Sequence, residues 1–431
     1  MMKRVLQIAC IGFLLGLSAC SSLQSLDTDW INSILYTPTP TPVSPTAVSS
    51  QATPGAQTPT VTPEPAVTQP TALRIWLPAQ FNPNTDSDAS TLLKQRLTTF
   101  EAEHPGFVIE VRIKSEQGEA DLLNSLAITS MAAPEALPDL IALPRASLEA
   151  AAQKRLVKPL EGLSTDLQSR DWYPYARELG KVNGTMYGLP FAGDAQVIVY
   201  RPELVWIKNW DGILLSESHL IFPAADPRAP VGLALYVSAG GELQDAQGKP
   251  MFEQETLSQV LELFAKGRSA GIFPNAASNL AVEEQAMQEY RARRAEMVIT
   301  HYSQFRPAQD GLLQPLMGLD VDHFTFANGW VWAMTSQKPE TQELTLDLAE
   351  YLMADDFLPR WVSEAGYLPT YPASATGAVG DSVTSVIQAA QLAPSNDVIQ
   401  ALGPLMQEAI LRVLDGEKPE LVARSIVEKM K

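Results

Sequence analysis

The chain has 431 residues, a length that predicts two or three folding units, or two units and an unstructured part. Hydrophobic residues make up 45% and charged residues 19%, which is the composition of a globular protein with a core. The formal net charge of −18 argues against DNA, RNA or anionic lipid as the main partner, because these partners need patches of lysine and arginine. The simpler interpretation of the charge is that it keeps the protein soluble.

The N-terminus has the features of an export signal. Lys3 and Arg4 precede an apolar stretch from Val5 to Leu17, which is too short to span a bilayer comfortably. The following Leu-Ser-Ala-Cys, which ends at Cys20, resembles the bacterial lipobox, in which the cysteine is acylated and becomes the new N-terminus. We therefore expect a lipoprotein signal peptide over residues 1–19 and lipidation of Cys20. The protein would then be anchored to the cell membrane by lipid, facing the extracytoplasmic side. The alternative is a plain secretory signal with a chance cysteine.

Residues 20–36 form the expected lipid-anchored N-terminal segment, and residues 37–71 read as a disordered linker. The linker is nearly all Pro, Thr, Ser, Ala, Val and Gln, with Glu64 as its only charge. Such a composition buries too little apolar surface to offset the entropy of ordering, and its prolines favour extended segments. We expect a stalk that holds the folded part away from the membrane.

Cysteine and histidine usage argues against disulfides and metal sites. Cys10 lies in the stretch expected to be removed, so the mature chain keeps one cysteine and cannot form an internal disulfide. There is no CxxC or HExxH motif, and no later stretch reaches 18 apolar residues. We expect no metal, no cofactor and no transmembrane helix. The four histidines are scattered along the chain: His104, His219, His301 and His323.

The folded part begins with alternating strands and helices. Apolar residues between Leu73 and Leu77, and between Ile109 and Ile113, alternate as in strands, and Leu140 to Leu143 is a short buried run. Between these strands, Leu92 to Phe100 and Leu122 to Ala127 show helical spacing. The order strand, helix, strand, helix, strand predicts a parallel sheet covered on both faces. Ligands of such sheets bind at the carboxyl ends of the strands.

A second block of strands and helices follows. A strand is predicted from Ala195 to Tyr200, another from Glu296 to Thr300, and a helix around Leu257 to Phe264 that ends near Gly271. The C-terminal third is predicted to be helical, with apolar stripes over residues 344–352, 402–413 and 422–430.

Several segments, in order, resemble the extracellular solute-binding protein family 1, which contains the maltose-binding-like proteins. The most specific is VNGTMYGLPFAGDAQVIVY from Val182, which is similar to the family's crossover motif dG-x-x-YGLP-F/Y. Together the segments cover nearly all of residues 73–431. The others are FEAEHPG from Phe100, DLLNSLA from Asp121, PDLIAL from Pro138, SAGG from Ser238, GIFP ending at Pro274, MVITHYSQF from Met297, NGWVWAMT from Asn328 and GYLPTYPAS from Gly366.

The resemblance implies an α/β, two-lobed periplasmic-binding-protein-like fold (type II). Each lobe would be a mostly parallel sheet flanked by helices, and a hinge that the chain crosses several times would join them. We expect the N-lobe to comprise residues 72–191 plus 312–353, and the C-lobe residues 192–311 plus 354–431. Gly193 would serve as a hinge residue because a glycine can absorb a change in φ and ψ. The solute would lie between the lobes and be trapped by their closure.

The resemblance also implies a function: a binding component of an ABC importer that delivers a small solute, mainly a mono- or oligosaccharide, to permease subunits. A monomer without enzymatic activity is expected. A pyranose offers an apolar face to aromatic rings and a rim of hydroxyls to polar side chains. Residues of these types at family-equivalent places are the expected ligand contacts: Gln80, Phe81, Arg145, Phe191, Asp194, Tyr236, Tyr302, Trp330 and Tyr367.

Each contact has a plainer alternative. Arg145 could be a surface arginine, Asp194 a hinge or helix-cap residue, and Tyr236 and Trp330 core aromatics.

The helical stretch over residues 402–414 lacks the aromatic that maltodextrin binders use as a stacking wall, which disfavours long linear maltodextrins. Amino acids, polyamines and metals stay open as ligands. A sensory binding component with the same fold is the main alternative function. An anchored glycoside hydrolase is the lesser one, because no GxSxG or paired-acid motif is present.

Overall fold

The computed structural model describes residues 71–430 except 117, 161, 163–167, 206, 306–310, 322, 336–338 and 373–379. All of these residues belong to one compact unit, Thr68–Lys431. The predicted signal peptide, Cys20, the segment 20–36 and the linker up to residue 70 lie outside the described residues.

Nine strands of the described chain form one mixed sheet in the order β2-β1-β3-β10-β6-β8-β7, with β11 on β10 and β9 on β6. Strands β1, β2 and β3 are parallel to one another, as are β7 and β8, whereas β10 runs antiparallel to both β3 and β6. The strands are β1 Thr71–Pro78, β2 Phe107–Lys114, β3 Leu140–Pro144, β6 Gly188–Tyr200, β7 Leu220–Ile221, β8 Met297–His301, β9 Leu312–Pro315, β10 Thr325–Met334 and β11 Ala390–Leu392.

The first third of the described chain confirms the predicted strand–helix alternation. Helix α2 (Asp88–Glu103) connects β1 to β2, and α3 (Leu122–Ala132) connects β2 to β3. Each helix begins with a side-chain cap. The Ser87 hydroxyl accepts a hydrogen bond from the backbone N–H of Ser90, and the Asp121 carboxylate accepts one from that of Asn124. Local signals therefore define where these elements start.

Strands β6 and β10 run side by side through the middle of the sheet. Their register pairs Trp330 with Ala192 and then Val331 with Pro190, so Phe191 has no partner on β10. This β-bulge sits in the strand that continues into the pairing with β8. A bulge re-aims the side chains on either side of it.

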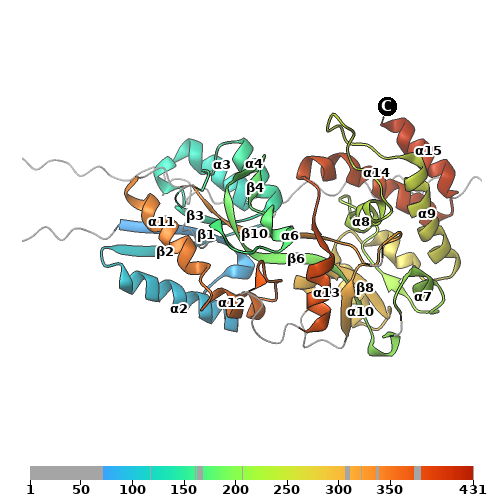
Figure 1. Cartoon of the computed structure of the whole chain (residues 1–431), viewed down its shortest axis with the longest axis horizontal. Helices are drawn as coiled ribbons and strands as arrows, with labels where there is room; N and C mark the ends of the chain where they lie inside the picture. Colours follow the sequence, from blue (N-terminus) through green and yellow to red (C-terminus); the bar gives the residue numbers. More distant parts are fainter. Residues whose placement is uncertain are drawn as a thin grey trace, which may run out of the picture. The chain divides into compact units, whose positions relative to one another are not determined.

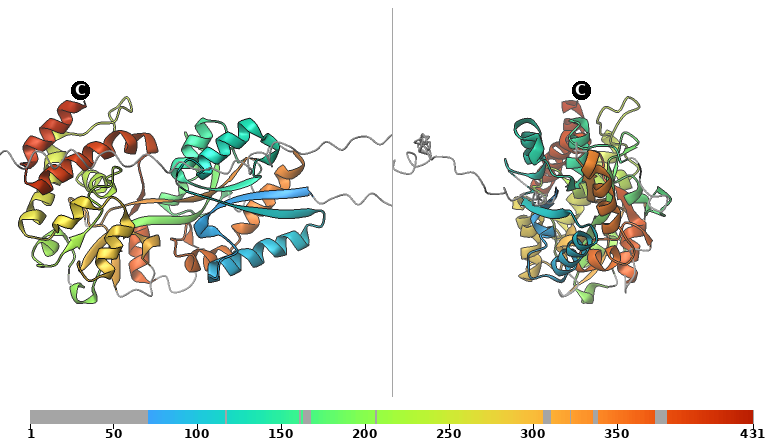
Figure 2. Two further views of the ribbon diagram at one scale, coloured as in Figure 1. Left: turned by 180° about the vertical axis from the view of Figure 1, so that it is seen from behind. Right: turned by 90° about the vertical axis from the view of Figure 1, so that its left-hand side faces the viewer.

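Helices gather around both ends of the sheet (Figures 1 and 2). The helices around β1, β2 and β3, which we call the first group, include α12, which contacts α2. In the second group, α9 contacts α8, α14 and α15. None of the described helices combines the length and apolar character needed to cross a membrane. The first group contains α2, α3, α4 Arg145–Gln153, α11 Pro339–Leu352 and α12 Leu358–Glu364. The second contains α7 Trp210–Leu214, α8 Pro230–Ser238, α9 Gln254–Ser269, α10 Glu283–Arg291, α14 Asn396–Asp415 and α15 Pro419–Lys429.

Two further helices contact strands of the sheet. Helix α6 (Pro174–Arg177) contacts β6, β10 and β11, and α13 (Asp381–Ala389) contacts β9. The short strands β4 (Lys181–Val182) and β5 (Thr185–Met186) form a separate hairpin just before β6.

Candidate functional site

Four of the predicted ligand residues meet in one aromatic cluster. The Phe81 ring, at the end of β1, lies with its centroid 5.4 Å from that of Phe191, 5.1 Å from that of Trp330 and 5.4 Å from that of Tyr367. Trp361 of α12 completes the shell at 5.3 Å. All of these contacts are edge-to-face, the arrangement that the ring quadrupole favours.

The cluster is largely sealed from solvent. Phe191 has no exposed surface and stacks on Trp332 at 4.3 Å, and Phe81 is 3% exposed. Trp330 is 7% exposed, whereas Tyr367 is half-buried at the edge of the cluster. In this arrangement Phe191 and Phe81 contribute to the core.

Asp194 is the centre of a polar cluster on the adjoining part of β6. Its carboxylate accepts hydrogen bonds from the Ser303 hydroxyl at 2.6 Å, the Ser303 backbone N–H at 3.1 Å and the Ala195 backbone N–H at 3.0 Å. A carboxylate has about four acceptor positions, so roughly one stays available. Burial raises the pKa of Asp194, although the charge of His301 and the Ser303 hydrogen bonds oppose this shift. Burial and the nearby Asp194 carboxylate raise the pKa of Tyr302, another predicted contact.

His301 ends strand β8 and is paired with a carboxylate. Its Nδ1 lies 2.5 Å from a Glu283 carboxylate oxygen, and the His301 backbone N–H donates to the same side chain at 3.0 Å. Burial opposes the charge on both groups. Glu283 nevertheless raises the pKa of His301 to about 9, and His301 lowers the pKa of Glu283. The pair is therefore ionised at neutral pH.

A small pocket opens beside this polar cluster, with a free volume of about 60 Å³. Register pairs place Gln196 opposite His301 and Asn328 opposite Asp194, so these four side chains share one face of the sheet. At the rim, the exposed Arg228 guanidinium is held by the buried Asp226 carboxylate at 2.9 and 3.1 Å. The pocket, which we call the strand-end pocket, is lined by Gln196, Arg228, Pro230, Leu233, His301, Phe326, Asn328, Ala393, Pro394 and Ile399.

The other predicted contacts lie apart from this pocket. Arg145 donates from Nε to Glu149 at 2.7 Å and also to the Glu178 carbonyl, so its guanidinium is engaged within the protein. Tyr236 has no exposed surface, and its hydroxyl accepts from the Glu253 backbone N–H at 2.7 Å. Gln80 is exposed beside Phe81 and hydrogen-bonds Glu116; burial raises the pKa of this carboxyl despite that bond.

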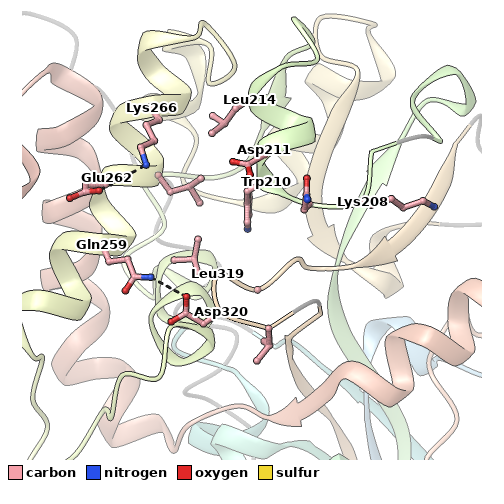
Figure 3. A pocket seen from close by; sticks show the side chains of 13 residues that line it. Lys208, Trp210, Asp211, Leu214, Gln259, Glu262, Lys266, Leu319 and Asp320 are labelled. Atoms are coloured by element: carbon pink, nitrogen blue, oxygen red, sulfur yellow. Dashed lines mark hydrogen bonds and ion pairs between the residues drawn. The ribbon is translucent and has the colours of Figure 1, made fainter.

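Two larger pockets offer competing sites. One, of about 410 Å³, lies between α7, α9 and the loop at Asp320 (Figure 3). Several of its polar groups pair within the protein: Gln259 donates to Asp320 at 3.2 Å, Lys266 lies 4.0 Å from Glu262, and Asn209 accepts from the Gly212 backbone N–H at 2.9 Å. The Trp210 indole N–H, at the centre of the view, is satisfied by the Met317 carbonyl at 2.9 Å. Most of the polar side chains of this pocket are therefore engaged within the protein.

The second, of about 730 Å³, lies near α6 and the β4–β5 hairpin. Its Arg170 is engaged, since it donates to the Met353 carbonyl at 2.9 Å, lies 3.3 Å from the Asp355 carboxylate and stacks over Tyr371.

Among the described residues, no group of three or more histidine, cysteine, aspartate or glutamate side chains is arranged to hold a metal ion.

Sequence reasoning missed several residues of the strand-end pocket. Gln196 lies two positions after Asp194 on the predicted strand, so alternation alone could have placed it on the same face. Asn328, and Ser303 that donates to Asp194 beside the pocket, both lie in segments that carry the family resemblance. The sequence did not indicate that Arg228 would lie at the pocket, because it belongs to an irregular stretch whose path only the folded chain defines.

Comparisons with known proteins agree with this fold. MalE3 of T. maritima with bound maltose has 17% identity and a TM-score of 0.64, covering 84% of this chain and 99% of that chain. The cyclic α-maltosyl-1,6-maltose binding protein of Arthrobacter globiformis has 14% identity and a TM-score of 0.67 over the same shares. A solute-binding protein of Thermotoga lettingae with bound α-D-tagatose has 18% identity and a TM-score of 0.61, covering 84% and 98%. At these identities the likeness shows the fold.

No curated protein matches by sequence. The profile described as bacterial extracellular solute-binding protein matches residues 95–392. This match spans most of the described unit, including β3, β6, β8, β10 and the residues of the strand-end pocket up to Asn328. The chain therefore belongs to the family of bacterial extracellular solute-binding proteins.

Proposed function

We propose that this protein captures a neutral mono- or oligosaccharide at the strand-end pocket and delivers it intact to the permease of an ABC importer. The observation that carries the proposal is the position of Asp194: a half-buried carboxylate with about one acceptor position left, beside a pocket that Gln196, His301 and Asn328 line. A half-buried acceptor of this kind suits a sugar hydroxyl.

The charges around the pocket favour a neutral solute. Three carboxylates, on Asp194, Asp226 and Glu283, face two cations, on Arg228 and His301. The small excess of negative charge disfavours an acidic sugar, and both cations are already paired with carboxylates, Arg228 with Asp226 and His301 with Glu283. Hydroxyl groups, which donate and accept, fit this mixed lining without a net charge.

Two lobes would close around the solute. In support, the helices form two groups, and β6 and β10 run between them. We place the first lobe around β1, β2 and β3. Because α12 contacts α2, residues 358–364 fit this lobe better than the second lobe, to which the sequence assigned them.

The pocket of about 60 Å³ is smaller than the roughly 300–1,000 Å³ typical of ligand sites, so a whole sugar would enter with the lobes further apart.

The contact set that we propose differs from the one predicted from sequence. It keeps Asp194, Tyr302 and the half-buried Tyr367, and it adds the pocket residues Gln196, Arg228, His301 and Asn328. Phe81, Phe191, Trp330 and Tyr236 are buried, and we assign them to packing behind the site.

A panel of maltose, D-tagatose, D-glucose and an acidic sugar, read by thermal shift, tests the proposal. We expect at least one neutral sugar to raise the melting temperature by linkage and the acidic sugar to do so less. No shift with any neutral sugar, or chemical turnover of a labelled one, would contradict the proposal.

The Asp194→Asn variant should bind the same sugar about tenfold or more weakly, because a hydrogen bond to a charged group contributes about 1.5–3 kcal/mol. Titration calorimetry measures the loss. Asp211→Asn, in the pocket of Figure 3, is the matched control and should bind as the wild type does. If Asp194→Asn binds the sugar as tightly as the control does, Asp194 does not contact the sugar.

We also propose that the protein is a monomer held at the membrane through lipid on Cys20. The support is the Leu-Ser-Ala-Cys motif behind a short apolar segment. Cys20→Ser should move the protein from the membrane fraction to the soluble fraction of expressing bacteria, as measured by fractionation and immunoblotting. A variant that stays with the membrane to the same extent as the wild type would refute lipid anchoring.

A further inference from the structure

One buried polar atom at the strand-end pocket has no partner. In the described part of the chain, four buried side-chain atoms lack a hydrogen bond: the indole nitrogens of Trp76, Trp332 and Trp361, and Oε1 of Gln196. Of these four, only Gln196 also lines a pocket described above. Gln196 is 1% exposed, so bulk water does not reach it. A buried acceptor without a donor costs free energy, so a bound ligand that supplies a donor to Gln196 would remove this cost.

The surroundings restrict the donor that could satisfy this atom. His301 pairs with Gln196 across the β6–β8 ladder and is cationic, and Arg228 lies at the rim, but each of these cations is already paired with a carboxylate, on Glu283 and Asp226, so neither leaves an unpaired charge beside Gln196. A protonated acid is disfavoured because acidic sugars are ionised at neutral pH and would meet the carboxylate of Asp194. For the saccharide of the proposed function, the neutral donor that can reach this acceptor is a hydroxyl.

The size of the pocket restricts how much of a solute can enter. Its free volume of about 60 Å³ corresponds to roughly two water molecules at about 30 Å³ each. A hydroxymethyl group or one hydroxyl-bearing edge of a ring would fill it. Phe326 and Leu233, both buried, form apolar walls that offer no substitute donor.

We infer that Gln196 is a specificity-determining residue, whose Oε1 accepts a hydrogen bond from one hydroxyl of the solute bound at the strand-end pocket. The inference rests on the proposed function. A solute that lacks this hydroxyl leaves the buried acceptor unpaired, and this mismatch is a strong basis for rejection.

The first arm of the test needs no solute. Gln196→Met keeps the length of the side chain and removes the acceptor, so the unliganded variant should melt about 2 °C or more above the wild type. Gln391→Met makes the same change at an exposed position of β11 and should leave the melting temperature nearly unchanged. A Gln196→Met variant that melts at or below the wild-type temperature would show that the acceptor is already satisfied, and would overturn the inference.

The second arm measures selectivity with the neutral sugar that gives the largest shift in the panel above and its monodeoxy analogues. The wild type should bind the parent sugar at least about tenfold more tightly than one analogue, and Gln196→Met should reduce that ratio to about twofold or less. Gln391→Met should keep the wild-type ratio. The same ratio in wild type and Gln196→Met would overturn the inference while leaving the proposed function standing. If no neutral sugar binds the wild type, the proposed function fails, and the unliganded comparison still decides whether Gln196 holds an unpaired acceptor.

Discussion

At the scale of single residues, the strand-end pocket depends on charges that hold one another in place. Glu283 on α10 keeps His301 protonated, and Asp226 fixes the guanidinium of Arg228. Each pair reduces the cost of burying its members, because an ion in a partly dry site needs a counter-charge and hydrogen bonds. The protein can therefore present polar side chains to a neutral solute without leaving isolated buried charges.

The His301–Glu283 pair should make stability depend on pH. The pKa of His301 is about 9 in the folded protein and about 6.5 in an unfolded chain, so its contribution is complete below pH 6.5 and lost as pH rises through 9. At most about 3 kcal/mol is involved. Melting curves should show the wild type well above His301→Gln near pH 6, and little difference near pH 10.

His219→Gln is the control for this comparison, because His219 is half exposed and lies 3.9 Å from its carboxylate partner. Its pH profile should follow that of the wild type. A difference between wild type and His301→Gln that stays constant from pH 6 to 10 would show that the charge of His301 does not stabilise the fold.

At the scale of elements, strand β6 combines tight packing with the position expected of a hinge. Gly193 exchanges backbone hydrogen bonds with Leu368 at 2.8 and 2.7 Å while it pairs with Gly329 on the other edge. A Cβ at position 193 would lie 2.0 Å from the Tyr175 hydroxyl. The glycine is therefore needed for close approach, whereas its φ is not in the left-handed region. Its role as a hinge stays a prediction.

Gly193→Ala should lower the free energy of unfolding by about 1–3 kcal/mol, because the added methyl group must push Tyr175 or the strand aside. Chemical denaturation measures the change. Gly380→Ala is the matched control, since no atom lies within 4 Å of the Cβ that it would add. Equal stability of the two variants would mean that β6 can shift without cost, which would favour a flexible hinge at this point.

At the scale of the whole described unit, one carboxylate links the two helical groups. Glu149 on α4 accepts from the backbone N–H of Asn396 at 2.9 Å, at the start of α14, and its other oxygen is held by Arg145. Ser395, the residue before α14, makes no side-chain cap of its own. The carboxylate thus satisfies a free N–H at the positive end of a long helix.

Glu149→Gln should lower the free energy of unfolding by about 1 kcal/mol, because it removes a charge near a helix N-terminus and one partner of a mostly buried ion pair. Denaturant titration gives the difference. Glu262→Gln makes the same substitution in an exposed pair on α9 and should change stability by about 0.5 kcal/mol or less. A loss no larger than the control's would show that the link between α4 and α14 adds no stability.

Local patterns were enough to predict the strand–helix order from β1 to β3, the strand β8 and the C-terminal helices, because caps and hydrophobic periodicity act over a few residues. The family followed from ordered motifs along the chain. The composition of the pocket did not follow, because it depends on the pairing of β6 with β8 and with β10, in which Gln196 meets His301 and Asp194 meets Asn328 across more than a hundred positions of the chain. That pairing turns Gln196 and Asn328 toward one pocket and buries Phe191 at a bulge. Only the folded sheet sets which neighbours each of these side chains meets, since strand register is a long-range property.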